Sequence, residues 1–264
     1  MESINFIAGG MMGDFIHSLS AVKNICEKNN AKARIYLSDD RNYGGDTWRH
    51  GVDKAHADLK DIVMNQSYVD GFEVLSNQGI VSAYNLNGWR SYIMTLYMKE
   101  GGFKRCWSDF MSQTYGFGIT ADYGWLNIVK NEEFKDKVII HRSTHRHNND
   151  FPWETVLDSI KEDILFLTSS EEEFNNFKFK RDRIKLHLVQ TMSDMAVVIG
   201  SCKYFVGNQS APFALASSMD VSRLVELNEE ASRFYMSEEK YSKNISWFLN
   251  GNNKHISENS LVKL

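Results

Sequence analysis

The sequence from Ile4 to Leu19, INFIAGGMMGDFIHSL, contains the pattern that decides the fold. Its first five residues form a short apolar run, which predicts a buried β-strand. Glycines at positions 9, 10 and 13 interrupt this run, and Asp14 begins a stretch in which apolar side chains recur at helical spacing. A strand, a glycine loop and a helix in this order predict the first unit of an α/β domain.

The same alternation continues along the chain and predicts two α/β halves of comparable size. In the first half we expect a strand at Ala33–Leu37, a helix around Val52–Met64, a strand at Phe72–Leu75 and mainly helical, aromatic structure from Trp89 to Tyr115 with a break at residues 101–102. The periodicity lapses between Asp122 and Lys137, so we place the boundary there, with domains at residues 1–130 and 131–264.

The second half has the clearer pattern. Strands are expected at Val138–His141, Ile164–Leu167, Ile184–Leu188, Tyr204–Val206 and Arg223–Leu227, and helices should begin near Trp153, Ser170, Thr191 and Pro212. Thr191 and Asp194 resemble a helix-capping pair. From Glu229 to Phe248 we expect a polar helix, which could return to the N-terminal domain. Strands that alternate with helices predict right-handed βαβ units around parallel sheets, whose ligands bind at the carboxyl ends of the strands.

The composition is that of an ordinary globular protein. Of 264 residues, 42% are hydrophobic and 24% are charged. No run approaches the roughly 18 apolar residues that span a bilayer, and the first residues lack the basic segment of a secretory signal. We therefore expect a cytoplasmic protein. The net charge of -4 disfavours broad affinity for nucleic acids, although a local basic cleft could still exist.

Neither cysteines nor histidines predict a metal site. Cys26, Cys106 and Cys202 are far apart and never form a CxxC pair. Three histidines lie within the seven residues from 141 to 147, but no ligand set completes a recognisable spacing, so we favour a polar loop. We expect no metal and no cofactor.

Three segments have the residues for chemistry. In the first, Asp14 and His17 lie one helical turn apart; the spacing alone suits a helix cap for Asp14 as well as a catalytic carboxylate. In the second, Arg142 and Arg146 follow a buried strand and could neutralise a diphosphate.

The third segment is Tyr204–Ala216, where an apolar strand enters a polar turn and then a helix. Gln209, Ser210 and the first N–H groups of that helix suit a phosphate or ribose, although the turn alone is generic. Glu226, at the end of the next strand, is either a nucleoside contact or a strand-terminal acid. Arg90 is an acceptor-side candidate, with a surface salt bridge as the alternative.

In this order and spacing, the three segments resemble the bacterial heptosyltransferase family, glycosyltransferase family 9. The family's Gly-Asp-x-x-His motif is matched by Gly13, Asp14 and His17, and its late Gly-Asn-Asp-Ser-Gly-Pro turn resembles residues 207–212. Residues 141–153, a basic loop followed by a helix that begins at Trp153, are also similar to the mid-chain segment of the family. The late motif differs at Gln209, where the family usually has Asp, and at Ala214, where it usually has His.

The resemblance implies the α/β GT-B fold, in which two Rossmann-like domains face each other across a cleft. The N-terminal domain would bind a hydroxyl acceptor beside Gly13, His17 and Arg90, and Asp14 would be the catalytic base. The C-terminal domain would bind a nucleotide-sugar donor, with its diphosphate near Arg142, Arg146 and Ser210 and its nucleoside near Gln209 and Glu226. Transfer would be metal-independent and would invert the anomeric centre.

Several alternatives stay open. The acceptor could be a glycan, a lipid-linked glycan or a hydroxymethylated DNA base, although the charge disfavours DNA. A catalytically inactive protein of the same fold that binds nucleotide sugars or glycans is the main alternative to an enzyme. A Rossmann-type oxidoreductase lacks support because no GxGxxG motif is present.

Overall fold

The computed structural model describes residues 2–40, 47–75, 82–100, 105–116, 124–228, 237–249 and 253–255. The chain divides into two compact units, Met1–Asn127 and Ile128–Leu264. This division lies close to the boundary predicted at residue 130. No helix in the described part of the chain has the length and apolar character needed to cross a membrane.

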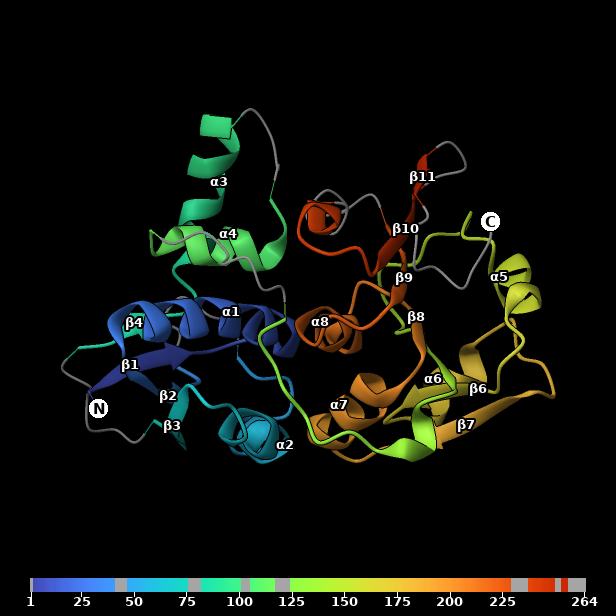
Figure 1. Ribbon diagram of the computed structural model, residues 1–264, viewed down its shortest axis with the longest axis horizontal. Helices are drawn as coiled ribbons and strands as arrows, with labels where there is room; N and C mark the ends of the chain where they lie inside the picture. The colour runs from blue at the N-terminus through green and yellow to red at the C-terminus, as the bar shows by residue number, and fades with distance from the viewer. Residues whose placement is uncertain are drawn as a thin grey trace. The chain divides into compact units, whose positions relative to one another are not determined.

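The N-terminal unit contains a four-stranded parallel sheet in the order β3-β2-β1-β4. Its strands are β1 (Ser3–Ala8), β2 (Lys32–Leu37), β3 (Val69–Val74) and β4 (Tyr84–Asn85), and its helices are α1 (Met12–Asn29), α2 (Val52–Met64), α3 (Trp89–Glu100) and α4 (Trp107–Thr114). Helix α1 is buried along most of its length because it lies between the sheet and α4 (Figure 1). The hydroxyl of Ser20 donates to the Ser108 carbonyl, which ties α1 to α4.

The segment Gly124–Asn127, at the end of the N-terminal unit, is fixed to the body of that unit. The indole Nε1 of Trp125 donates to the Ile16 carbonyl at 2.7 Å, and the Tyr68 hydroxyl donates to the Trp125 carbonyl at 2.8 Å. Gln66 makes a reciprocal pair of hydrogen bonds with the backbone of Asn127. Trp125 is itself almost fully buried. Asn127, the last residue of the unit, is therefore held by the same domain.

The C-terminal unit contains a seven-stranded sheet in the order β11-β10-β9-β8-β5-β6-β7. Its strands are β5 (Val138–His141), β6 (Ile164–Thr168), β7 (Ile184–Leu188), β8 (Tyr204–Asn208), β9 (Arg223–Glu226), β10 (Ile245–Leu249) and β11 (Asn253–His255); its helices are α5 (Trp153–Ser159), α6 (Glu171–Asn176), α7 (Met192–Ser201) and α8 (Ala211–Ser218), with short 3-10 turns η2 (Glu132–Phe134) and η3 (Ser237–Lys240). All pairs except β10–β11 are parallel. If β5 is counted as the first strand, the six parallel strands follow the Rossmann order 3-2-1-4-5-6.

The core of the C-terminal unit combines aliphatic and aromatic side chains. Strands β5, β6 and β8 supply residues with little or no exposure, as expected for parallel strands that are covered on both faces. Trp153 and Phe177 pack edge to face against each other in the same cluster. At Gly207 a Cβ atom would lie 2.9 Å from the His141 carbonyl oxygen, so only glycine allows β5 and β8 to approach this closely.

The helix expected from Glu229 to Phe248 is wrong in its described part. Residues from Ser237 to Lys240 form a 3-10 turn, and Ile245–Leu249 form strand β10, which pairs with β9. A buried ion pair of 2.9 Å between Arg223 and Glu238 fixes the turn to β9. The polar composition favoured a helix, but the tertiary pairing of four residues, Ile245 to Phe248, with strand β9 decides the strand. Residues 229–236 of this prediction lie outside the described residues.

Two interpretations of helix starts are resolved by the structure. The N-cap of α1 is Met11, and Asp14 is the third residue of the helix, so the capping interpretation of Asp14 is wrong. Its side chain is instead directed to another partner, described below. Thr191 accepts a hydrogen bond from the Asp194 backbone, which confirms this capping pair.

Candidate functional site

Each parallel sheet has one topological switch point, where a ligand-binding crevice is expected. In the N-terminal unit the chain runs from β1 to β2 and β3 and then returns to place β4 on the other side of β1. In the C-terminal unit it runs from β5 to β6 and β7 and returns with β8 on the other side of β5. The residues that follow these central strands are therefore the candidate site residues.

At the N-terminal switch point, the structure brings together Asp14 and Arg90. Asp14 belongs to α1, which follows β1, and Arg90 belongs to α3, which follows β4. Nη2 of Arg90 donates to Oδ2 of Asp14 at 2.8 Å, and the two side chains are 28% and 23% exposed. The guanidinium also lies over the Trp89 ring, 4.7 Å from its centroid. The pair is thus held in place, yet it remains accessible to a substrate.

The loop that presents Arg90 is held by a dense set of hydrogen bonds. The Leu86 backbone donates to the Ile7 carbonyl, the Asn87 backbone donates to Oδ1 of Asn85, and the Tyr115 hydroxyl donates to the Asn85 carbonyl at 2.5 Å. Burial raises the pKa of Tyr115, so this hydroxyl stays a donor at neutral pH. The loop is therefore a rigid support for the arginine.

The structure does not place all predicted acceptor-side residues in an accessible position. His17 is only 3% exposed, and its ring lies 6.0 Å from that of Trp125. His17 packs inside the N-terminal unit, and its contact with an acceptor stays a prediction. Gly13 is the second residue of α1 and lies beside Asp14 in the first turn.

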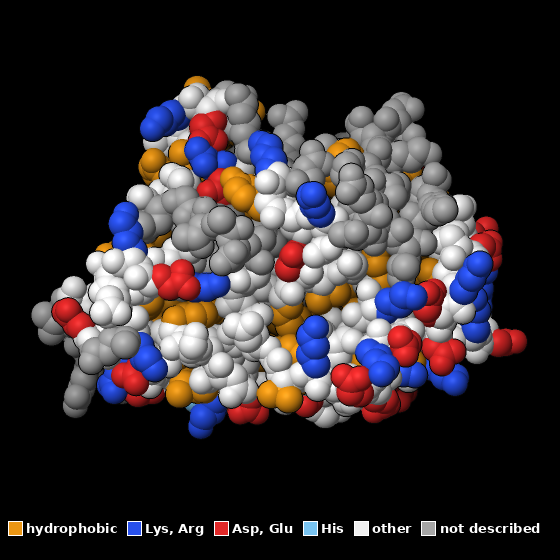
Figure 2. Space-filling model, viewed as in Figure 1, with side chains coloured by type: hydrophobic (Ala, Val, Ile, Leu, Met, Phe, Trp, Pro, Cys, Tyr) orange, Lys and Arg blue, Asp and Glu red, His pale blue; other side chains and the backbone are white. Residues whose placement is uncertain are grey.

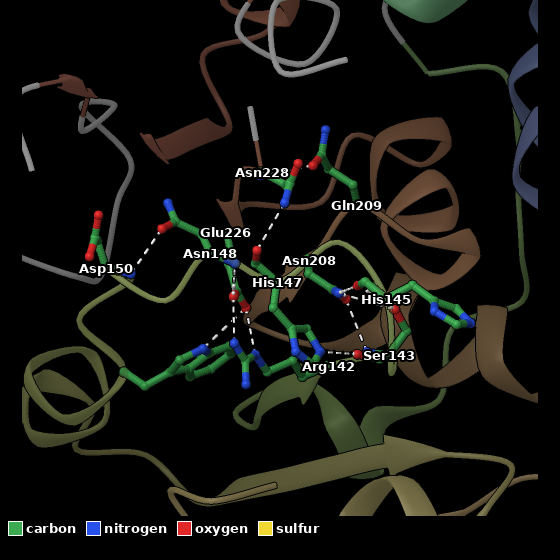
Figure 3. Close-up of polar contacts among 11 residues, drawn as sticks. Arg142, Ser143, His145, His147, Asn148, Asp150, Asn208, Gln209, Glu226 and Asn228 are labelled. Atoms are coloured by element: carbon green, nitrogen blue, oxygen red, sulfur yellow. Dashed lines mark hydrogen bonds and ion pairs between the residues drawn. The ribbon is translucent and has the colours of Figure 1, made fainter. Parts of the chain in front are cut away.

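At the C-terminal switch point, Arg142 and Glu226 form a bidentate ion pair (Figure 3). Nε and Nη2 of Arg142 each donate to one carboxylate oxygen at 2.8 Å. Glu226 is fully buried, and it also accepts from the Asn148 backbone at 2.7 Å and from the Trp153 indole at 3.1 Å. Four donors therefore satisfy one carboxylate, which offsets the cost of burying its charge.

This network bears on the predicted nucleoside contact of Glu226, which stays a prediction. The carboxylate is buried and accepts from four protein donors. Arg142 is 11% exposed and directs two of its nitrogen atoms to Glu226. The predicted contact of Arg142 with a diphosphate would have to use the rest of its guanidinium.

Asn208, which was not among the predicted site residues, joins the two loops of this switch point. It is fully buried at the end of β8. Its Oδ1 accepts from the Ser143 backbone at 3.0 Å, and its Nδ2 donates to the Ser143 hydroxyl at 3.0 Å and to the His145 carbonyl at 2.6 Å (Figure 3). The available signal was its place in the turn of residues 207–212, but its partners are more than 60 residues away.

The remaining predicted donor residues have different environments. Arg146 is exposed and adopts a left-handed backbone conformation with φ of 57°. Gln209 is 2% exposed, and its Oε1 accepts from the Asn228 backbone at 2.9 Å. Ser210 is the N-cap of α8, and its hydroxyl donates to the Asn208 carbonyl. The helix start itself is thus left without a side-chain cap.

A cavity of about 220 Å³ lies beside the loop that follows β5. Its polar lining combines hydroxyl, imidazole, amide and carboxylate groups, and Phe177 supplies an apolar wall. The polar residues are Arg142, Ser143, Thr144, His147, Glu173 and Asn176. Such a mixture suits a ligand with both a flat apolar part and several hydroxyl groups.

Below this loop, His141 forms the buried end of β5. Burial lowers the pKa of His141, although the Glu173 carboxylate and the Leu167 carbonyl oppose this effect. Its Nδ1 lies 2.8 Å from that carbonyl. Among the residues that the structure describes, no group of three or more His, Cys, Asp and Glu side chains is arranged to hold a metal ion.

Comparison with known proteins identifies the fold. No protein-family model matches the sequence, and no curated protein matches it either. Solved structures do: E. coli heptosyltransferase WaaC with ADP superposes with a TM-score of 0.58 and 10% identity over 93% of this chain and 92% of that chain. WaaC with ADP-2-deoxy-2-fluoro heptose gives a TM-score of 0.52 and 10% identity over 84% of this chain and 88% of that chain.

A glycosyltransferase of family 9 from Veillonella parvula is similar to the same degree. Its TM-score is 0.50 with 13% identity, over 85% of this chain and 80% of that chain. The chain therefore has the α/β fold of these glycosyltransferases, and the GT-B prediction with its heptosyltransferase-like character is confirmed at the level of the fold.

Proposed function

We propose that this protein is a glycosyltransferase that moves a sugar from a nucleotide-diphosphate-sugar donor to a hydroxyl acceptor. The proposal rests on the side chains that the structure presents at the two switch points. One presents an accessible carboxylate, Asp14, and the other presents an exposed cation, Arg146, and the uncapped start of α8. Proton removal and stabilisation of a departing diphosphate need this pair of functions.

In this proposal Asp14 is the catalytic base. Its carboxylate takes the proton of the acceptor hydroxyl while the anomeric carbon becomes oxocarbenium-like. The hydroxyl then attacks from the face opposite the diphosphate, so the anomeric configuration inverts. Arg90 orients the carboxylate, because its Nη2 donates to Oδ2 of Asp14 at 2.8 Å.

The C-terminal unit would bind the donor. The first N–H groups of α8 and the guanidinium of Arg146 would face the diphosphate, since both attract phosphate oxygens. The nucleoside would occupy the cavity beside Phe177. Protein cations would thus stabilise the leaving group in a metal-independent reaction, which activity in the presence of a chelator would test.

The acceptor that fits best is a glycan or a lipid-linked glycan. A DNA acceptor would require a continuous basic surface. On the face shown in Figure 2, the Lys and Arg side chains of the described residues are intermixed with Asp and Glu. A cytoplasmic location is part of the proposal, and cell fractionation would test it.

Two measurements test the proposed function. Thermal unfolding with ADP, GDP, UDP and CMP, and with their sugars, should show stabilisation by at least one of them, because a ligand of the native state raises Tm. The stabilising nucleotide sugar should then be consumed by the wild type and not by Asp14→Asn. Absence of stabilisation by every nucleotide in this series would contradict the proposal.

A catalytically inactive nucleotide-sugar or glycan-binding protein is the second candidate. It is favoured by Gln209, which replaces an expected Asp and uses its Oε1 to hold the Asn228 backbone inside the unit. A protein that binds the nucleotide sugar, shows no consumption of it, and is unaffected in binding by Asp14→Asn would be of this kind.

A further inference from the structure

We propose that Asn208 is a positioning residue for the donor diphosphate: it shapes the loop after β5 so that Arg146, and not Arg142, meets the phosphates. This inference rests on the proposed function, because it assigns roles within the proposed donor site. It divides two arginines that the sequence pattern could not distinguish. It also gives a role to a buried amide that contacts no solvent.

The first observation is the number and direction of the Asn208 contacts. All three go to one short stretch of the opposite loop: the Ser143 backbone, the Ser143 hydroxyl and the His145 carbonyl. Both ends of the amide are used, so rotation of the amide by 180° would lose them. The side chain is fully buried, and the shape of the loop therefore depends on it directly.

The second observation is the backbone of Arg146. Its φ of 57° lies in the left-handed region, which a residue with a Cβ rarely adopts unless its surroundings enforce it. The carbonyls on both sides are held: Asn208 binds that of His145, and Nδ2 of Asn228 binds that of His147 at 2.9 Å. The first hydrogen bond fixes the peptide plane that precedes Arg146, and the second holds the peptide that follows His147. The unusual conformation of Arg146 therefore lies between two fixed peptides.

The third observation is the contrast between the two arginines. Arg142 is mostly buried and uses Nε and Nη2 for the Glu226 carboxylate. Arg146 is exposed, and no ion pair of its side chain is found among the described residues. A guanidinium that is already paired gains less from a phosphate than one that is not. The diphosphate contact is therefore assigned to Arg146. Arg142 is assigned a structural role, which is its ion pair with Glu226.

The experiment compares a nucleoside diphosphate with its monophosphate. The probe is whichever of ADP, GDP or UDP stabilises the wild type, together with AMP, GMP or UMP of the same base, and Kd is measured by calorimetry. For the wild type the diphosphate should bind more tightly. Arg146→Gln should weaken diphosphate binding about tenfold, as expected for one charged hydrogen bond, and should hardly change monophosphate binding.

The variant Asn208→Ala should have the same effect as Arg146→Gln, and the double variant should bind the diphosphate no more weakly than either single variant. This non-additivity is expected only if Asn208 acts through Arg146. A purely structural role would weaken both ligands equally or lower Tm alone. The control is Arg181→Gln, which removes an exposed ion pair with Asp158 in the same unit. It should keep the wild-type ratio of the Kd values for the monophosphate and the diphosphate.

Clear outcomes overturn the inference. An unchanged ratio of the two Kd values in Asn208→Ala, or additive losses in the double variant, would exclude the positioning role. If Arg142→Gln lost the preference for the diphosphate over the monophosphate and Arg146→Gln kept it, the diphosphate contact would belong to Arg142 and not to Arg146. If Asn208→Ala does not fold, Asn208→Asp keeps the shape and removes the two donated hydrogen bonds. A wild type that binds no nucleotide would instead contradict the proposed function itself.

Discussion

The two switch points contain the same chemical pair in opposite settings. Each joins an arginine to a carboxylate at 2.8 Å, across 76 residues in the N-terminal unit and 84 residues in the C-terminal unit. Asp14 and Arg90 keep about a quarter of their side-chain surface exposed. Glu226 has none, and two further donors complete its shell.

The difference in exposure separates an ion pair that a ligand can reach from one that it cannot reach. A partly exposed carboxylate such as Asp14 can exchange its guanidinium partner for a substrate hydroxyl. A buried carboxylate with four donors cannot do so without a large desolvation cost. The two ion pairs have the same distance of 2.8 Å, and the exposure of the acid is what distinguishes them.

The largest expected effect is loss of transfer in Asp14→Asn. Removal of a general base should lower kcat about 10²- to 10⁴-fold, while Tm stays near that of the wild type because the pair is partly exposed. Donor consumption and thermal unfolding measure the two quantities. If Asp14→Asn kept most of its kcat, the base would have to be another residue. The exposed ion pair would then differ from the buried one in exposure alone.

The equivalent change in the C-terminal unit should act on stability. In Glu226→Gln, Arg142 loses its counter-ion in a buried position, which should cost about 3–5 kcal/mol in the free energy of unfolding. Urea unfolding of the wild type and the variant measures this difference in the free energy of unfolding. Glu154→Gln, at an exposed position of α5, is the control and should change stability by less than about 0.5 kcal/mol. Equal effects of the two variants would show that Glu226 is not the centre of this network.

Arg90→Gln sharpens the comparison within the N-terminal unit. It should reduce kcat roughly fivefold, the rate equivalent of the ~1 kcal/mol that a partly exposed ion pair contributes. The control is Arg34→Gln, which removes an exposed pair with Asp70 in the same unit and should leave kcat unchanged. Similar losses in both variants would argue against a special role for Arg90.

The smallest effect concerns the pH dependence of stability in the C-terminal unit. Burial lowers the pKa of His141, so below the ordinary value of 6.5 the unfolded chain binds a proton that the folded chain does not. The free energy of unfolding should therefore fall as pH decreases from 6.5 towards the lower pKa of the folded state, by at most ~1.4 kcal/mol per pH unit. His141→Gln should flatten this slope in urea titrations, and an unchanged slope would assign it to other groups.

Much of the fold was predictable because parallel strands are continuous apolar runs. Strands β5 and β7 and helix α2 have the predicted bounds, and α7 begins at its predicted cap. Strand β4 was not predicted, since two residues are too few for a periodic signal. Strand β10 was also missed, because its polar flanks favoured a helix and only its pairing with β9 fixes it.

The site was predictable only in part. Sequence similarity indicated Asp14 and the loop of Arg142 and Arg146, whose residue types suit the chemistry. It could not indicate that Asp14 meets Arg90 or that Glu226 is enclosed by donors, because these contacts join residues far apart in the sequence. Asn208 was missed for the same reason, since its importance arises from a partner loop and not from its neighbours along the chain.

The anchoring of Gly124–Asn127 determines where the gene can be divided. A fragment for the N-terminal unit that stopped before Trp125 would leave the carbonyl of Ile16 and the hydroxyl of Tyr68 without their partners inside the domain. On the other side, Ile128 already fills the space against Gly200, where even a methyl group would lie 2.7 Å from its side chain. The peptide bond between residues 127 and 128 is thus the natural point at which to separate the halves for independent expression.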